Sequence, residues 1–153
     1  MDPYFLETLR EAAANIESFH RQQVHKNFVV NDKPGIVLGQ KYTPIEKAGV
    51  YVPGGTAAYP STVLMDVIPA KVAGVSEIVM TTPAGKDGRV NPVILAAAAT
   101  AGVTKIFKTG GAQAVAALAT APRASPRWIR SLAPATSTLP PPSARCSARW
   151  ASI

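Results

Sequence analysis

The chain has 153 residues, of which 47% are apolar, and this length allows one ordinary domain with a sizeable core. No apolar run reaches the length of a bilayer span and the start has no signal-peptide pattern, so we expect a cytoplasmic setting without a membrane partner. The net charge of +7 comes mostly from five arginines after residue 119; the rest has 11 basic and 9 acidic residues, a net of +2, which argues against a nucleic-acid partner.

The first segment predicts a helix followed by a turn. Apolar residues recur at helical spacing over residues 3–23, which predicts an amphipathic helix. His20 and His25 follow at its end, and we interpret them as surface or helix-end residues because no carboxylate or thiol shares their spacing as a metal ligand would. In the irregular stretch up to Pro44, residues 31–35 predict a turn and residues 37–40 a short strand.

Three strand–helix units come next. The patterns predict strands at 48–53, 77–82 and 104–108 and helices at 63–73, 92–101 and 112–119. We expect Ser61 or Thr62 to cap the first of these helices and Pro69 to kink or split it. Asn91 is expected to cap the next helix, with Pro92 at its first position. Strands that alternate with helices of this length predict a parallel sheet with helices flanking it.

Two glycine pairs lie where a strand leads into a helix. They belong to the segments YVPGG at 51–55 and TGGAQ at 109–113. Glycine in such a turn lets the backbone approach an anion at the helix N-terminus, and ligands of parallel sheets bind at the carboxyl ends of the strands. This favours a nucleotide or phosphate site. The alternative is that the glycines only make tight turns, since the G-x-G-x-x-G pattern is absent.

At these residues the chain resembles the histidinol dehydrogenase family, whose members use NAD and zinc in the last steps of histidine biosynthesis. The matching segments are FHRQQ from Phe19, LGQ from Leu38, YVPGGTAAYPSTVLMDVIPAKVAGV from Tyr51 and TGGAQAVAALA from Thr109. The match is colinear over residues 3–119. The resemblance implies a Rossmann-like fold, an intertwined homodimer and two cofactor-binding residues, Tyr51 and Gln113, which contact NAD in the family.

The same resemblance implies a division of the chain. Residues 1–50 correspond to the N-terminal helix and linker of the first family domain, and residues 51–121 to an incomplete Rossmann-like NAD-binding domain. The family oxidises L-histidinol to L-histidine through the aldehyde, with zinc orienting the substrate and a Glu-His pair acting as acid and base. The chain contains no Glu-His pair. We therefore interpret the chain as a fragment that lacks the zinc ligands and the catalytic residues, and we expect it to be inactive alone.

Two alternatives stay open at this point. The chain could be a stand-alone nucleotide-binding module that retains NAD affinity through Tyr51 and Gln113. It could also be a relative that oxidises another small alcohol, because the residues that would set substrate specificity are absent from it. A nucleic-acid binder with a basic tail is the least favoured interpretation.

The final segment, residues 122–153, is rich in Pro and Arg, contains no acidic residue and predicts a disordered tail. Its lone Cys146 cannot form an internal disulfide. After GGAQAVAALA the family continues with a tyrosine and a GPGN motif, whose asparagine is a third NAD contact. If a codon series GCC TAC GGC ACC GCG lost the first base of TAC, it would encode Ala119-Thr-Ala-Pro122 and the start of Arg123. We therefore predict that the tail is out of frame.

Overall fold

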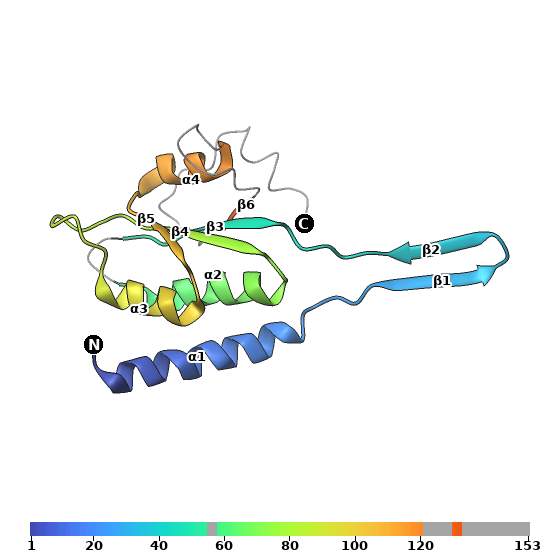
Figure 1. The fold of residues 1–153 in the computed structure, drawn as a ribbon, viewed down its shortest axis with the longest axis horizontal. Coiled ribbons are helices and arrows are strands. Elements are labelled where there is room, and N and C mark those ends of the chain that lie inside the picture. The colour runs from blue at the N-terminus through green and yellow to red at the C-terminus, as the bar shows by residue number, and fades with distance from the viewer. Residues whose placement is uncertain (55–57, 121–129, 133–153) are drawn as a thin grey trace.

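The computed structural model describes residues 1–54, 58–120 and 130–132. Figure 1 shows an α/β body from which a long two-stranded hairpin extends. No helix among the described residues is both long and apolar enough to cross a membrane. The elements in chain order are α1 (Pro3–Arg21), β1 (Phe28–Lys33), β2 (Ile36–Gln40), β3 (Lys47–Tyr51), α2 (Pro60–Val72), β4 (Glu77–Thr81), α3 (Pro92–Ala101), β5 (Lys105–Phe107), α4 (Gly111–Thr120) and β6 (Arg130–Leu132).

The body is built on a parallel sheet with the strand order β5-β4-β3-β6. β3 pairs with β4, and β4 with β5, so neighbours in the sequence are neighbours in space. β6 then pairs with the opposite edge of β3. Helices α2 and α3 lie on one face of the sheet, and α4 lies on the other (Figure 1). The parallel sheet and its flanking helices confirm the predicted fold class, and each of the three predicted strands is present.

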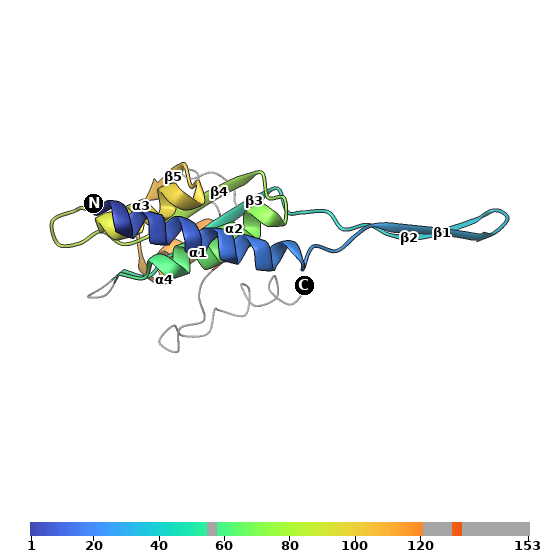
Figure 2. The same cartoon turned by 90° about the horizontal axis from the view of Figure 1, so that it is seen from below.

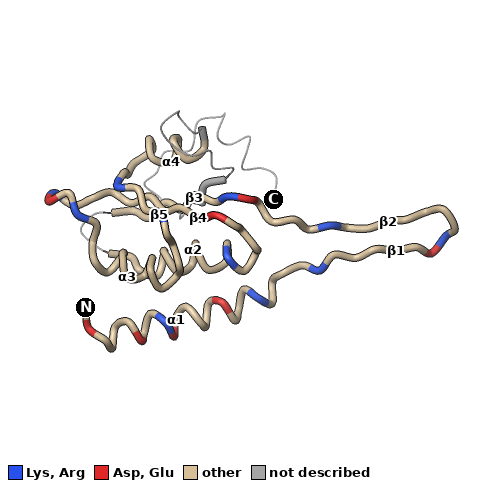
Figure 3. Tube along the Cα trace, viewed as in Figure 1, with Lys and Arg blue, Asp and Glu red and all other residues tan. Residues whose placement is uncertain are grey.

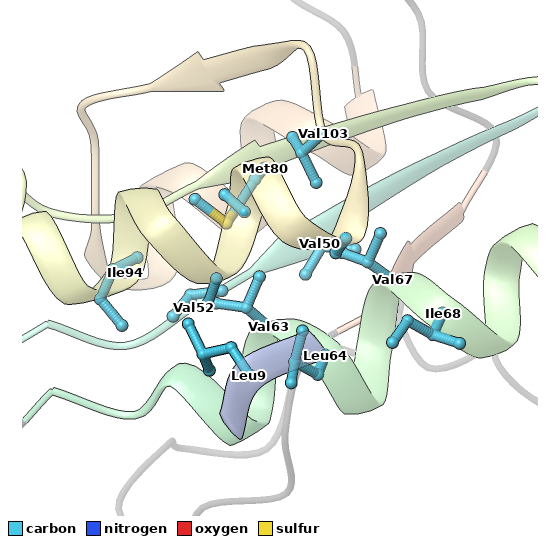
Figure 4. Close-up of a cluster of buried hydrophobic side chains, with 13 residues drawn as sticks. Leu9, Val50, Val52, Val63, Leu64, Val67, Ile68, Met80, Ile94 and Val103 are labelled. Carbon is cyan, nitrogen blue, oxygen red and sulfur yellow. The ribbon is translucent and has the colours of Figure 1, made fainter. Parts of the chain in front are cut away.

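Most of the apolar core lies between the sheet and the helices α2 and α3. Figure 4 shows side chains from β3, β4, α2 and α3 converging there, with Leu9 of α1 packed at the outer side. α1 runs across the outer surface of α2 and α3, as the view from below shows (Figure 2). On the opposite face the described core is much smaller, consisting of Val79 in β4 and Leu118 in α4. Among the described residues, the two faces of the sheet are therefore covered very unequally.

Both ends of α3 follow the sequence, whereas the start of α2 does not. The Asn91 side chain accepts a hydrogen bond from the Val93 amide at 2.9 Å, as predicted for an N-cap. α2 instead begins at Pro60, whose restricted φ suits the first helical position, so neither Ser61 nor Thr62 caps it. The helix is also not split at Pro69. It continues as one element to Val72, and the Ala73 amide at its C-cap donates to the Pro69 carbonyl at 2.9 Å.

The hairpin, which we call the arm (residues 28–40), contains one strand more than predicted. The expected short strand is β2, but β1 was not expected. Almost all side chains of β1 are exposed, so buried and exposed residues do not alternate along it. The alternation of apolar and polar residues that predicts a half-buried strand is therefore missing from this part of the sequence. At the base of the arm the Tyr42 amide donates to Asn27 Oδ1 at 2.6 Å, and the Tyr42 ring stacks on His25. These contacts tie the two ends of the arm together.

Within the predicted tail, the structure describes residues 130–132, which form β6 where no strand was expected. β6 pairs with the edge of β3, where backbone donors and acceptors can bind another strand whatever its side chains are. The rest of 122–153 lies outside the described residues, and the frameshift stays a prediction.

In Figure 3, basic and acidic residues are interspersed along α1 and at the tip of the arm.

Candidate functional site

The two glycine turns meet at the carboxyl edge of the parallel sheet. β3 ends at Tyr51, and α4 begins at Gly111 after the exit of β5. The Gly111 amide donates a hydrogen bond to Tyr51 Oη at 3.1 Å. This bond joins two motifs that lie sixty residues apart in the sequence. The predicted convergence of the two turns at one edge is therefore present in the fold.

Tyr51 and Gln113 are linked through the same glycine. Only 7% of Tyr51 is exposed, so its ring has little open surface for a ligand. Its hydroxyl group instead connects the two turns. Gln113 is exposed on the first turn of α4. A Cβ atom on Gly111, whose φ is +76°, would lie 2.6 Å from Gln113 Oε1, which places the Gln113 amide against this glycine. The structure thus brings both sequence-predicted residues to one place.

Sequence reasoning missed Pro83, which lies at the same edge. A Cβ atom added to Gly54 would be 2.3 Å from Pro83 Cγ, and one added to Gly110 would be 2.6 Å from Pro83 Cβ. Both turns therefore approach the proline ring closely. A signal was available in the strand order. Pro83 follows β4, and a residue at the exit of the middle of three parallel strands must lie between the exits of its neighbours.

The position of these turns suits a dinucleotide. Since β4 and β5 lie on one side of β3 and β6 on the other, the strand order reverses at β3, where open α/β sheets bind their ligands. α4 directs its N-terminal end, the positive end of the helix dipole, toward this edge. Glycine turns and an exposed amide complete a set of groups that fit NAD. They contain no carboxylate that would repel a pyrophosphate.

Two ion pairs among the described residues join neighbouring strands away from this edge. At the amino ends of the strands, Lys105 and Lys47 pair with Glu77 at 2.5 and 3.1 Å. These hydrogen bonds, first that of Lys105 and then that of Lys47, lower the pKa of Glu77. They tie β3, β4 and β5 together at the edge opposite the glycine turns. Their role is therefore in joining the strands.

The two histidines lie elsewhere. His20 Nδ1 is 2.6 Å from Gln23 Oε1 at the end of α1, and His25 stacks on Tyr42. Both line a cavity of about 340 Å³ between the end of α1 and the end of α2. Over residues 1–54, 58–120 and 130–132, no three or more His, Cys, Asp or Glu side chains are grouped so as to hold a metal. The described residues around the two histidines therefore do not fit a zinc site.

The whole chain was compared with known protein families and with curated proteins. A family model described as histidinol dehydrogenase matches residues 1–127. Histidinol dehydrogenase from Chlorobaculum tepidum is 59% identical over 118 residues, which cover 77% of this chain and 28% of that protein. The enzyme of the same name from Listeria monocytogenes serotype 4b is 50% identical over 134 residues, which cover 88% of this chain and 31% of that protein.

A solved structure gives the same result. The crystal structure of histidinol dehydrogenase from Elizabethkingia anophelis superposes with a TM-score of 0.82 at 34% sequence identity, covering 90% of this chain and 32% of that one. The chain spans about 28% of the length of the curated relatives from Chlorobaculum tepidum and Listeria innocua. The family model covers most of the chain, and sequence and fold agree with it. The chain belongs to the histidinol dehydrogenase family.

Proposed function

We propose that this chain supplies the NAD-binding crevice of a histidinol dehydrogenase, an enzyme that oxidises L-histidinol to L-histidine through the aldehyde. The observation that carries the proposal is the hydrogen bond between Tyr51 Oη and the Gly111 amide, which joins both glycine turns at the point where the strand order reverses. When bound, NAD accepts a hydride in each of the two oxidation steps. The division of the chain at residues 50 and 121 stays part of this proposal.

The residues of this chain would bind and orient the cofactor. Gln113 offers both a donor and an acceptor beside the N-terminus of α4, where a phosphate oxygen is favoured. Tyr51 holds Gly111 in place, so that the start of α4 keeps one position before the ligand arrives. Such preorganisation strengthens binding because less ordering remains to be done in the complex. In this proposal, Gln113 contacts NAD and Tyr51 acts on affinity mainly by fixing the turn.

Calorimetric titration of the soluble chain with NAD tests the proposal. We expect Tyr51→Phe to lose one neutral hydrogen bond, which corresponds to about 0.5–1.5 kcal/mol or roughly a two- to tenfold higher Kd. Gln113→Ala should weaken binding by a similar or larger factor, since a direct contact is removed. Tyr4→Ala and Gln22→Ala are matched controls, because both residues are exposed at α1 away from the edge. Binding that neither site variant weakens would contradict the proposal.

Turnover is a separate expectation. The 153-residue chain alone, supplied with histidinol, NAD and zinc, should release no NADH above background. Its sequence contains no Glu-His pair, and its two histidines lie at the end of α1 and the base of the arm. The measurement is the absorbance of NADH over time, with a full-length relative as positive control. Clear turnover by the purified chain would overturn the interpretation as an NAD-binding part without its own catalytic groups.

A further inference from the structure

The exit of β4 is held in place from both sides. The Val52 amide, just beyond β3, donates to the Thr81 carbonyl at 2.9 Å. The Thr82 amide donates to the Phe107 carbonyl of β5 at 3.1 Å. Thr81 and Thr82 are themselves buried. Pro83 therefore emerges from a fixed backbone, and its own ring removes one more rotational freedom.

Both glycine turns touch the ring of Pro83. A Cβ atom on Gly54 would lie 2.3 Å from Cγ and 3.1 Å from Cδ of this ring. A Cβ atom on Gly110 would lie 2.6, 2.9 and 3.0 Å from its Cβ, Cγ and Cδ. Neither glycine has a positive φ. The reason for glycine at these two positions is therefore close approach rather than backbone conformation.

We propose that Pro83 is a positioning residue of the NAD crevice, a rigid spacer that sets the separation of the turns after β3 and β5. Gly54 and Gly110 are then glycines because a proline ring lies between them. A flexible side chain could rotate away from an added methyl group, but a pyrrolidine ring attached to a fixed backbone cannot. The inference rests on the proposed function, since it concerns the shape of the same crevice.

A different explanation is that the ligand, and not Pro83, requires glycine at positions 54 and 110. In nucleotide-binding turns, glycine also allows the backbone to approach a pyrophosphate. If the ligand required Gly54 and Gly110, changing Pro83 would not relieve a substitution at either position. The two explanations therefore differ in one measurable quantity, the coupling between Pro83 and each glycine.

The distances make the coupling asymmetric. Pro83→Ala removes Cγ and Cδ, the side-chain atoms nearest to Gly54, and leaves the Pro83 carbonyl oxygen, at 3.3 Å, as the nearest atom. It leaves the Pro83 Cβ, which is the atom nearest to Gly110. Pro83→Ala should therefore rescue Gly54→Ala but not Gly110→Ala. Gly110→Ala should be rescued by Pro83→Gly, which also removes Cβ.

The experiment is a set of double-mutant cycles on the full chain, read by NAD titration at a temperature where circular dichroism shows each variant folded. We expect Gly54→Ala and Gly110→Ala each to raise the Kd by roughly tenfold or more, and the matching double variant to return to within about threefold of its Pro83 parent. Gly85→Ala is the control, because the atoms nearest to its added methyl belong to Asp87 and Arg89 instead of Pro83. Its effect should be the same with or without Pro83.

Additive effects in both cycles would overturn the proposal that Pro83 is a spacer between the two turns. The melting temperature of every variant is measured alongside, so that folding and binding are separated. A single variant that fails to fold and whose matching double variant folds supports the spacer, whereas failure of both counts against it. If the unaltered chain does not bind NAD, the proposed function fails, and the rescue pattern in the melting temperatures alone decides whether Pro83 separates the turns.

Discussion

At the scale of single residues, Asp66 is the side chain most at odds with its surroundings. It lies within α2, and its Oδ2 is buried without a hydrogen-bond partner among the described residues. Burial raises its pKa from 3.8 to about 6. A buried carboxyl of this kind favours the protonated form, because the charged form loses hydration that nothing replaces.

The sign of the pH dependence follows from this shift. The folded chain keeps a proton on Asp66 that the unfolded chain releases, so the free energy of unfolding falls as the pH rises from about 4 to about 6. We expect Asp66→Asn to raise the unfolding free energy at pH 7 by about 1 kcal/mol, allowing for partial solvent access, and to change it little at pH 4. Urea unfolding at both pH values measures this. Asp32→Asn, on the exposed arm, is the control. An equal change at both pH values would refute the prediction.

At the scale of elements, helix caps distinguish α2 from α3. Asn91→Ala removes the side-chain acceptor for the Val93 amide and should lower the unfolding free energy by about 1 kcal/mol. Ser61→Ala is the matched comparison and should stay within about 0.5 kcal/mol, because Ser61 is exposed inside the first turn and caps nothing in the structure. Chemical denaturation of the two variants checks this. A larger loss for Ser61→Ala would mean that Ser61 caps the helix, which is one of the two caps that the sequence predicted.

The elements also show where sequence reasoning succeeded and where it failed. Apolar patterns located β3, β4, β5 and their helices, and the cap Asn91 located the start of α3, because those segments carry their own signals. β1 escaped prediction because both faces of the arm are exposed and no burial pattern marks it. Pro83 escaped because its role arises from the spatial order of three strands, and no local pattern at Thr81-Thr-Pro83 encodes that order. Tyr51 and Gln113 were found through a family motif, whereas their link through Gly111 arises only when the fold brings the two turns together.

At the scale of the whole molecule, the arm exposes large apolar side chains beyond the body. Val29 is 71% exposed and Val37 67% exposed, and a two-stranded ribbon alone is only marginally stable. Apolar surface and open strand edges of this kind promote association. We expect the double variant Val29→Thr and Val37→Thr, which keeps β-branched side chains, to reduce association without changing the unfolding free energy by more than about 0.5 kcal/mol.

Light scattering over a concentration series measures the association. A matched control replaces two exposed apolar residues of the body, as Met65→Gln with Leu95→Gln, and should have the smaller effect. If the body variant reduces association as much as the arm variant does, the arm is not the source of it.

The unequal covering of the two faces of the sheet, as far as the described residues show it, has a consequence for the order in which the body opens. α4 is held on its face by a small apolar contact of Leu118 with Val79, whereas α2 and α3 share the large core on the other side. Segments with few buried apolar contacts open first in local fluctuations. Opening of α4 would carry Gly111 away from Tyr51 and leave the large core intact. The crevice can therefore come apart and reform while the rest of the chain remains folded, so that a cofactor bridging the two turns would bind the chain and close α4 in the same event.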